Sequence, residues 1–281
     1  DPSTAIVFGE KGAGKTALKL QMVRQFDRHN ETHPESKTLV VLYDDFNPFL
    51  DRFVSRVGKG RAVEKVLGQW KLWDHMDAIL TLSVTQLVTQ LLGATGKLPR
   101  LTRPQARDLA LLAACYDQST ADSFPSRWSR LRRRVGYRAW LGSWPGLLAI
   151  AATAAFVAAV LAGFWRGEVG WLSRWWPWAL LGAAWLPCRI VGSMRSGNRT
   201  VSQLARALAA MPEVDLAGQP LPALPRSDDR YELIAKLQGV LAALGWSGWV
   251  VIVDRLDEPD LINGSAERMR QVIWPMLDNK F

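Results

Sequence analysis

The chain has 281 residues, enough for one or two domains with a sizeable core, and its formal net charge is +9. This charge alone would suit a nucleic-acid-binding protein. However, six arginines gather between residues 127 and 138, directly before a long apolar stretch, which is more typical of a membrane flank. Two distant cysteines exclude a disulfide framework and a cysteine metal site, and they indicate a reducing compartment. We therefore expect no nucleic-acid partner.

Residues 9–16 match the phosphate-binding pattern G-x-x-x-x-G-K-[ST] in full. Residues 5–8 predict a short buried strand before it, and apolar residues at helical spacing over 16–26 predict a helix after it. In this pattern, backbone N–H groups and the helix N-terminus surround phosphate oxygens. The predicted nucleotide-binding residues are Gly9, Glu10, Lys11, Gly12, Ala13, Gly14, Lys15 and Thr16. Lys15 would reach the terminal phosphates, and the Thr16 hydroxyl would bind Mg²⁺.

Two apolar segments in the middle of the chain predict a membrane hairpin. Residues 147–165 carry no charge, and at about 1.5 Å per residue they can cross a hydrocarbon core of roughly 30 Å. The second segment, 175–188, is shorter and could span, re-enter or lie at the interface. Nine of the 14 tryptophans fall between Trp128 and Trp185, as in an aromatic belt. The alternative is a buried helical hairpin in a soluble protein.

The charges that flank the two apolar segments predict their orientation. Arginines dominate both outer flanks, whereas the connecting loop holds only Arg166 and Arg174. Positively charged flanks tend to stay in the cytoplasm. We therefore expect a plasma or inner membrane protein with two helices and a cytoplasmic nucleotide domain. The lipid bilayer would be a partner.

Further elements follow from the apolar pattern. Residues 37–43 predict a parallel strand that Asp44 and Asp45 end as a turn or helix cap, with a direct role at the nucleotide as the less favoured alternative. Residues 48–92 and 103–116 predict helices, and the prolines of 212–225 mark a connector. Ser227 predicts the start of a helix that Gly245 ends. Another helix is expected over 265–277.

A second apolar strand, 249–253, ends at Asp254. A nucleotide site of this kind needs a carboxylate for Mg²⁺ opposite the Thr16 hydroxyl, so Thr16 and Asp254 are the predicted metal ligands. Asp257 and Glu258 follow, and either could orient or deprotonate the attacking water. The predicted catalytic residues are Lys15, Asp254, Asp257 and Glu258. Guanine-specific features are missing, which favours ATP over GTP.

A phosphate-binding loop, then a membrane hairpin, then an acidic strand resembles the KAP family of P-loop NTPases in the order of its parts. The specific motifs of this resemblance are residues 9–16 and 250–257. The resemblance implies an α/β fold, a three-layer P-loop NTPase sandwich with a parallel sheet interrupted by a helical insertion with the hairpin. In that family the acidic motif is typically Asp-Asp-Leu-Asp-Arg, whereas this chain has Asp254-Arg255-Leu256-Asp257-Glu258.

The resemblance also implies a further strand between the first strand and the acidic strand. The chain shows no such strand after Val253, so we expect the sheet to be incomplete at the C-terminus and the sequence to be a piece of a longer protein. The expected organisation is 1–58 (first part of the NTPase domain), 59–138 (helical insertion), 139–192 (hairpin), 193–226 (helix and connector) and 227–281 (second part of the NTPase domain).

The resulting functional hypothesis is a membrane-anchored ATPase whose Mg²⁺-dependent ATP hydrolysis drives or times an assembly or signalling event at the cytoplasmic face. Self-association or a protein effector would fit such a role. The alternative is an ATP-gated switch or scaffold with little hydrolysis, which Arg255 in place of an acid favours. A soluble DNA-linked ATPase that uses the arginines of 127–138 is the third and least favoured interpretation.

Overall fold

The computed structural model describes residues 4–7, 9–10, 12–57, 63–137, 144–167, 178 and 203–278. The chain divides into two compact units, one formed by residues 1–137 and 220–281 and the other by residues 138–219. The first unit holds both strands and the residues of the predicted nucleotide site. Residues 59–138, expected to form an insertion, belong to this unit except for Arg138, and helix α4 packs directly on its sheet.

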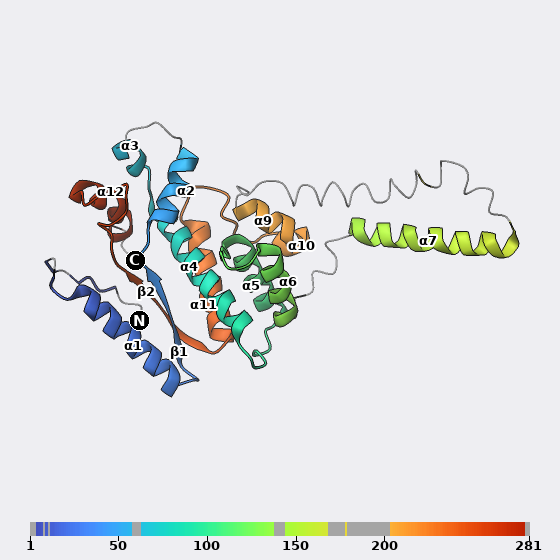
Figure 1. Cartoon of the computed structure of the whole chain (residues 1–281), viewed down its shortest axis with the longest axis horizontal. Helices are drawn as coiled ribbons and strands as arrows, with labels where there is room; N and C mark the ends of the chain where they lie inside the picture. Colours follow the sequence, from blue (N-terminus) through green and yellow to red (C-terminus); the bar gives the residue numbers. More distant parts are fainter. Residues whose placement is uncertain are drawn as a thin grey trace. The chain divides into compact units, whose positions relative to one another are not determined.

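The first unit places helices on both faces of a two-stranded parallel sheet (Figure 1). Helix α1 contacts strand β1 on one face, while α4 contacts β1 and α11 contacts β2 on the other. The helices α5 and α6 pack against α4 in turn. The elements of this unit are α1 (Lys15–Thr32), β1 (Lys37–Tyr43), α2 (Asn47–Val57), α3 (Val63–Leu67), α4 (Leu72–Gly93), α5 (Arg103–Tyr116), α6 (Phe124–Val135), α11 (Asp228–Ala243), β2 (Trp246–Val253) and α12 (Ala266–Leu277).

The two predicted strands are confirmed, and they pair with each other in parallel. Leu39 pairs with Trp249 and Tyr43 with Val253, so both strands end at the same edge of the sheet. Side chains of β1 alternate, with Leu39, Val41 and Tyr43 buried, because successive residues of a strand point to opposite faces. The residues that follow each strand, Asp44 and Asp254, are therefore neighbours.

The outer edge of β1 is occupied by side-chain amides instead of a third strand. The Asn30 amide of α1 donates to Thr38 O (2.9 Å) and accepts from Thr38 N (2.7 Å), while Gln86 of α4 donates to Val40 O (2.9 Å). These contacts satisfy backbone groups that would otherwise be available to another strand. Among the described residues, no strand pairs with the other edge of β2.

The N-terminal segment differs from the prediction of a buried strand over residues 5–8. Residues 4–7 have no regular structure, and Ile6 and Val7 are 54 % and 56 % exposed, while Phe8 lies outside the described residues. A strand needs a partner for its backbone hydrogen bonds, and β2 pairs with β1 instead of with this segment. The further strand that the resemblance implies, between the strand before the loop and the acidic strand, stays a prediction.

Several predicted helices are confirmed at their expected positions. Helix α5 covers the predicted range and begins with a capping box in which Thr102 and Gln105 bond each other's backbone. Helix α12 begins after Ser265, whose side chain accepts from Arg268 N. Helix α11 ends at the predicted place, where Gly245 adopts a left-handed φ of 89°. The predicted 48–92 region consists of α2, α3 and α4.

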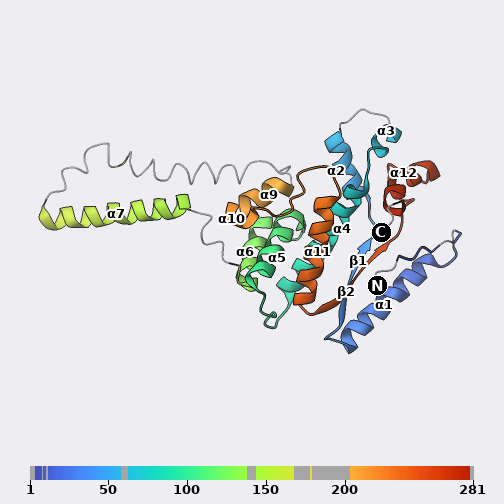
Figure 2. The same cartoon turned by 180° about the vertical axis from the view of Figure 1, so that it is seen from behind.

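The second unit contains α7 (Trp144–Arg166), α9 (Gln203–Ala210) and α10 (Glu213–Leu216). Figure 2 shows α7 as a long helix. The predicted second apolar segment, 175–188, lies outside the described residues except for Trp178, whose ring centroid is 5.4 Å from that of Phe156 on α7. This contact places one residue of the second segment beside the first.

Candidate functional site

The loop before α1 is compact and turns sharply into the helix. Ala13 N donates to Glu10 O (3.1 Å), and a Cβ on Gly9 would lie only 3.0 Å from Ala13 Cβ. Gly14 caps the helix with a φ of 82°, a conformation that favours glycine, and within the described part of the chain no side-chain cap hydrogen bond is formed there. The first N–H groups of a helix have no intrahelical partner, so this turn presents backbone donors together with a positive helix end.

Lys15, the first residue of α1, folds back over this loop. Its Nζ donates to Gly9 O (2.6 Å) and to Glu10 O (2.8 Å), which occupies two of its three N–H donors. The ammonium group is thereby held over the turn, whose residues Gly12, Ala13 and Gly14 are exposed. Thr16 is exposed next to it, and Lys11 lies outside the described residues. Those residues of the predicted phosphate-binding set that the structure describes therefore lie together at this loop.

The sequence analysis missed the residue that connects the loop helix to the acidic strand. Lys19, one turn after Lys15 on α1, is 9 % exposed, and its Nζ lies 2.8 Å from Asp254 Oδ2 and 3.1 Å from Asp44 Oδ2. Spacing by four places both lysines on one face of the helix, which is the signal that could have found Lys19. The ion pair with Lys19 brings Asp254, a predicted metal ligand, beside α1. Thr16, the other predicted metal ligand, lies on the same helix less than one turn from Lys19.

Lys19 and Asp254 each stabilise the charged form of the other. The contact with Asp254 raises the pKa of Lys19 above its usual value, although burial acts in the opposite direction. Burial by itself would raise the pKa of Asp254, but the Lys19 ammonium and the Arg255 backbone N–H hold it below its usual value. Both groups therefore remain ionised at neutral pH.

The residues present fit Mg²⁺ with a phosphate ligand. The Oδ2 atom of Asp254 is shielded from solvent, and among the described residues it has no well-aligned hydrogen-bond donor. Its close polar contact is the ion pair with the Lys19 ammonium. Within the described residues, no group of three or more His, Cys, Asp or Glu side chains gathers around one point. Mg²⁺ is usually held by one or two carboxylates, waters and phosphate oxygens, and Asp254 with Thr16 can supply such oxygens.

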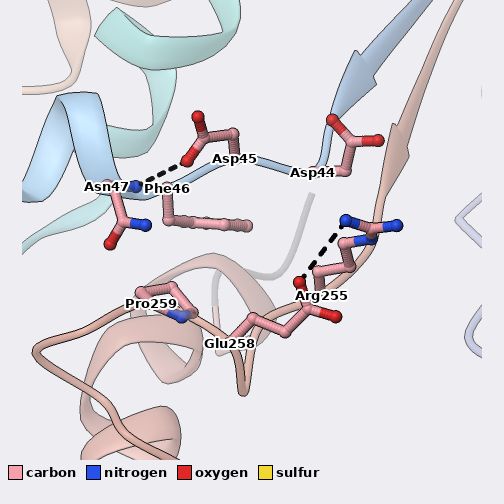
Figure 3. Close-up of a pocket in the computed structure, with 7 residues that line it drawn as sticks. All are labelled: Asp44, Asp45, Phe46, Asn47, Arg255, Glu258 and Pro259. Carbon is pink, nitrogen blue, oxygen red and sulfur yellow. Dashed lines mark hydrogen bonds and ion pairs between the residues drawn. The ribbon is translucent and has the colours of Figure 1, made fainter.

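A polar pocket of about 370 Å³ opens at the carboxyl end of the sheet. It is lined by residues that directly follow β1 and β2: Asp44, Asp45, Phe46, Asn47, Arg255, Glu258 and Pro259. Figure 3 shows Arg255 and Glu258 pointing toward one another, and their nearest charged atoms are 3.5 Å apart. Asp45 accepts from Asn47 N, as expected of a turn residue.

Two of the predicted catalytic residues lie on the loop after β2. Asp257 and Glu258 are both exposed. Glu258 is engaged by Arg255, which has a left-handed φ of 56° although it is not glycine. Arg255, one of the two residues at which this chain differs from the Asp-Asp-Leu-Asp-Arg motif, thus contacts one of the two candidate bases.

The arginines between residues 127 and 138 differ in burial, whereas the arginines of a membrane flank would all be exposed. Arg127 is buried and donates to both carboxylate oxygens of Asp117, with Nε–Oδ2 at 2.9 Å and Nη2–Oδ1 at 3.0 Å. It also donates to Thr89 Oγ1 of α4 (3.1 Å). The prediction that treats Arg127 as a flanking charge is therefore wrong, because this side chain is part of the core. Arg138 lies outside the described residues.

Two helices, α4 and α7, bear on the prediction of a membrane segment. Among the described residues, α4 is the one helix long and apolar enough to span a bilayer, and the apolar stretch is half buried. Its buried Asp74 and His75 and its contacts with β1, α5 and α11 are those of a core helix. In α7, the described side chains give a shorter apolar helix, Ala151–Arg166. Its Leu161, Phe164 and Trp165 are 64 %, 77 % and 94 % exposed.

Comparison with protein-family models, curated proteins and solved structures finds no match for this chain.

Proposed function

We propose that this chain binds ATP with Mg²⁺ on the loop of residues 9–16 and is anchored to a membrane by a helical hairpin. The observation that carries the proposal is the ion pair between Lys19 and Asp254 (2.8 Å), since it joins the helix after the loop to the acidic strand. Phosphate-binding donors and a metal-binding carboxylate must be close together in such a site. The KAP-like P-loop NTPase sandwich remains our working interpretation of the fold.

Each predicted residue has a role in this proposal. The backbone N–H groups of the loop would cradle the phosphates, and Lys15 would exchange its contacts with Gly9 O and Glu10 O for phosphate oxygens. Thr16 and Asp254 would hold Mg²⁺, which neutralises charge on the phosphates. Asp257 or Glu258 would orient or deprotonate the attacking water.

The membrane part of the proposal rests on α7. At about 1.5 Å per residue, a helix of 23 residues can cross roughly 30 Å of hydrocarbon. Leu161, Phe164 and Trp165 are exposed on it, which is costly in water and favourable in lipid. The contact between Phe156 and Trp178 is what a hairpin would give. The nucleotide domain would then lie at the cytoplasmic face of a plasma or inner membrane.

Turnover of ATP tests the catalytic part of the proposal. The full-length chain in detergent should release phosphate from ATP with Mg²⁺, and the Lys15→Ala variant should release it at least about tenfold more slowly. Equal rates for the two proteins would refute the catalytic role.

An ATP-gated switch with little hydrolysis is the second candidate, and the ion pair between Arg255 and Glu258 favours it. A carboxylate that contacts a guanidinium is less free to turn toward an attacking water than an unpaired one. Tight ATP binding without phosphate release, unchanged by Glu258→Gln, would decide for the switch. A self-associating or effector-binding assembly would suit either candidate.

A further inference from the structure

Two carboxylates meet at the carboxyl end of the sheet, and a single lysine contacts both of them. Tyr43 pairs with Val253, and Asp254 N donates to Tyr43 O (3.2 Å), so the next residues along the two strands, Asp44 and Asp254, are neighbours. The Lys19 ammonium lies within 3.1 Å of both. Neighbouring carboxylates repel each other unless a cation lies between them.

Lys19 occupies the position that a divalent cation would take at the same two side chains. Mg²⁺ prefers carboxylate oxygens, and Asp254 is the carboxylate that the proposed function assigns to it. An ammonium group and Mg²⁺ within a few ångströms of one another repel strongly in a partly buried site. Both cations therefore cannot hold this carboxylate pair together.

We infer that the Lys19 ammonium competes with Mg²⁺ for the carboxylate pair of Asp44 and Asp254, and that metal binding with ATP displaces Lys19 and recruits Asp44 to the metal side. This inference rests on the proposed function. Lys19 is then a positioning residue that holds Asp254 in place while metal is absent and sets the Mg²⁺ concentration at which ATP binds tightly.

The surroundings allow such an exchange. Asp44 is 34 % exposed at its side chain and also lines the pocket at the end of the sheet, so a hydrated ion can approach it from there (Figure 3). Asp254 is 22 % exposed at its side chain. The long, flexible stem of a lysine permits its ammonium to move while the helix stays in place.

The Mg²⁺ dependence of nucleotide binding tests the inference. A fluorescent ATP analogue is titrated into the full-length chain in detergent, with EDTA and with Mg²⁺, and the ratio of the two Kd values is compared among variants. Lys19→Met should raise this ratio at least about fivefold, because the competing charge is gone. Adding Asp44→Asn to Lys19→Met should reverse most of the gain, whereas Lys19→Arg, which keeps the charge, should resemble the wild type.

An unchanged ratio in Lys19→Met, or the same gain in the double variant, would overturn the inference. Failure of the proposed function gives a different result, because the analogue would then bind Lys15→Ala as well as the wild type. If Lys19→Met does not fold, amine labelling of the wild type replaces it. Acetic anhydride should then modify Lys19 more with ATP and Mg²⁺ than with ATP and EDTA, and equal labelling would contradict the exchange.

Discussion

The Lys19 ammonium lies 2.8 Å from Asp254 Oδ2, and this ion pair ties helix α1, which follows the loop of residues 9–16, to the end of strand β2. The two residues are separated by most of the chain, including the apolar segments of the second unit. The contact thus joins the two halves of the proposed nucleotide site. It also explains how a sheet with only two described strands can keep α1 close to the carboxyl end of β2.

Replacing Arg255 should change the rate of ATP hydrolysis, because Arg255 forms an ion pair with Glu258. Arg255→Asp breaks the ion pair with Glu258 and restores an acid at the position where the KAP family has one, and aspartate tolerates the left-handed φ of 56°. We expect phosphate release to rise at least about tenfold, as an efficient general base contributes more than this. Arg255→Asn is the matched control, since it frees Glu258 without adding an acid. Equal release by Arg255→Asp and the wild type would favour the switch.

Arg127 should matter for stability, whereas its exposed neighbour Arg133 should not. Arg127→Gln leaves the Asp117 carboxylate buried without its guanidinium, which costs about 3–5 kcal/mol of unfolding free energy. Arg133 is exposed and bonds only to Ser129 O among its recorded contacts, so Arg133→Gln should cost less than about 0.5 kcal/mol. Circular dichroism melting of both variants measures the difference. Similar melting temperatures would contradict the core role of Arg127.

Arg127 and Lys19 show where prediction from the sequence pattern ends. Strand β1 and helices α5 and α12 were predictable because their apolar spacing, capping residues and burial agree. The roles of Arg127 and Lys19 were not predictable, because a buried charge is defined by a distant partner, Asp117 in one case and Asp254 in the other. A local pattern contains no information about such pairs.

The same reason explains the difference at the N-terminus. Residues 5–8 are apolar enough for a strand, but a strand forms only where a neighbouring backbone supplies hydrogen bonds. The tight turn at residues 9–16 was predictable, since its glycines meet local requirements: Gly9 allows a close approach to Ala13, and Gly14 adopts a positive φ.

His75 should make the stability of the first unit depend on pH. Trp70 Nε1 donates to His75 Nε2 (2.9 Å), and Val272 O lies 2.7 Å from the same nitrogen. Burial lowers the pKa of His75 to about 4. Between about pH 6.5 and pH 4 the unfolded chain binds more protons than the native chain, so stability falls as the pH falls.

The expected loss between pH 7 and pH 5 is about 2 kcal/mol. Thermal unfolding at both pH values measures it, with His75→Gln as the test and His33→Gln, at an exposed histidine, as the control. The slope with pH should be shallower in His75→Gln and unchanged in His33→Gln. A slope in His75→Gln as steep as in the wild type would assign the effect to other groups.

A charge in the middle of α7 should impair membrane insertion. Val157 is half exposed near the centre of this helix, and an arginine there costs about 3 kcal/mol of insertion free energy. The wild type should remain in the membrane pellet after an alkaline carbonate wash, while a larger share of Val157→Arg should be extracted. Leu224→Arg, at an exposed apolar residue of the first unit, should behave as the wild type does. Complete extraction of the wild type would contradict the anchor.

Direct binding of ATP tests the central claim. The Kd of a fluorescent ATP analogue with Mg²⁺ is measured for the full-length chain, for Lys15→Ala and for Lys97→Ala, which removes an exposed lysine outside the loop. We expect Lys97→Ala to match the wild type and Lys15→Ala to bind at least about tenfold more weakly, because a charged hydrogen-bond donor to the phosphates is lost. Binding of equal strength by all three proteins, or by none, would contradict a nucleotide site on residues 9–16.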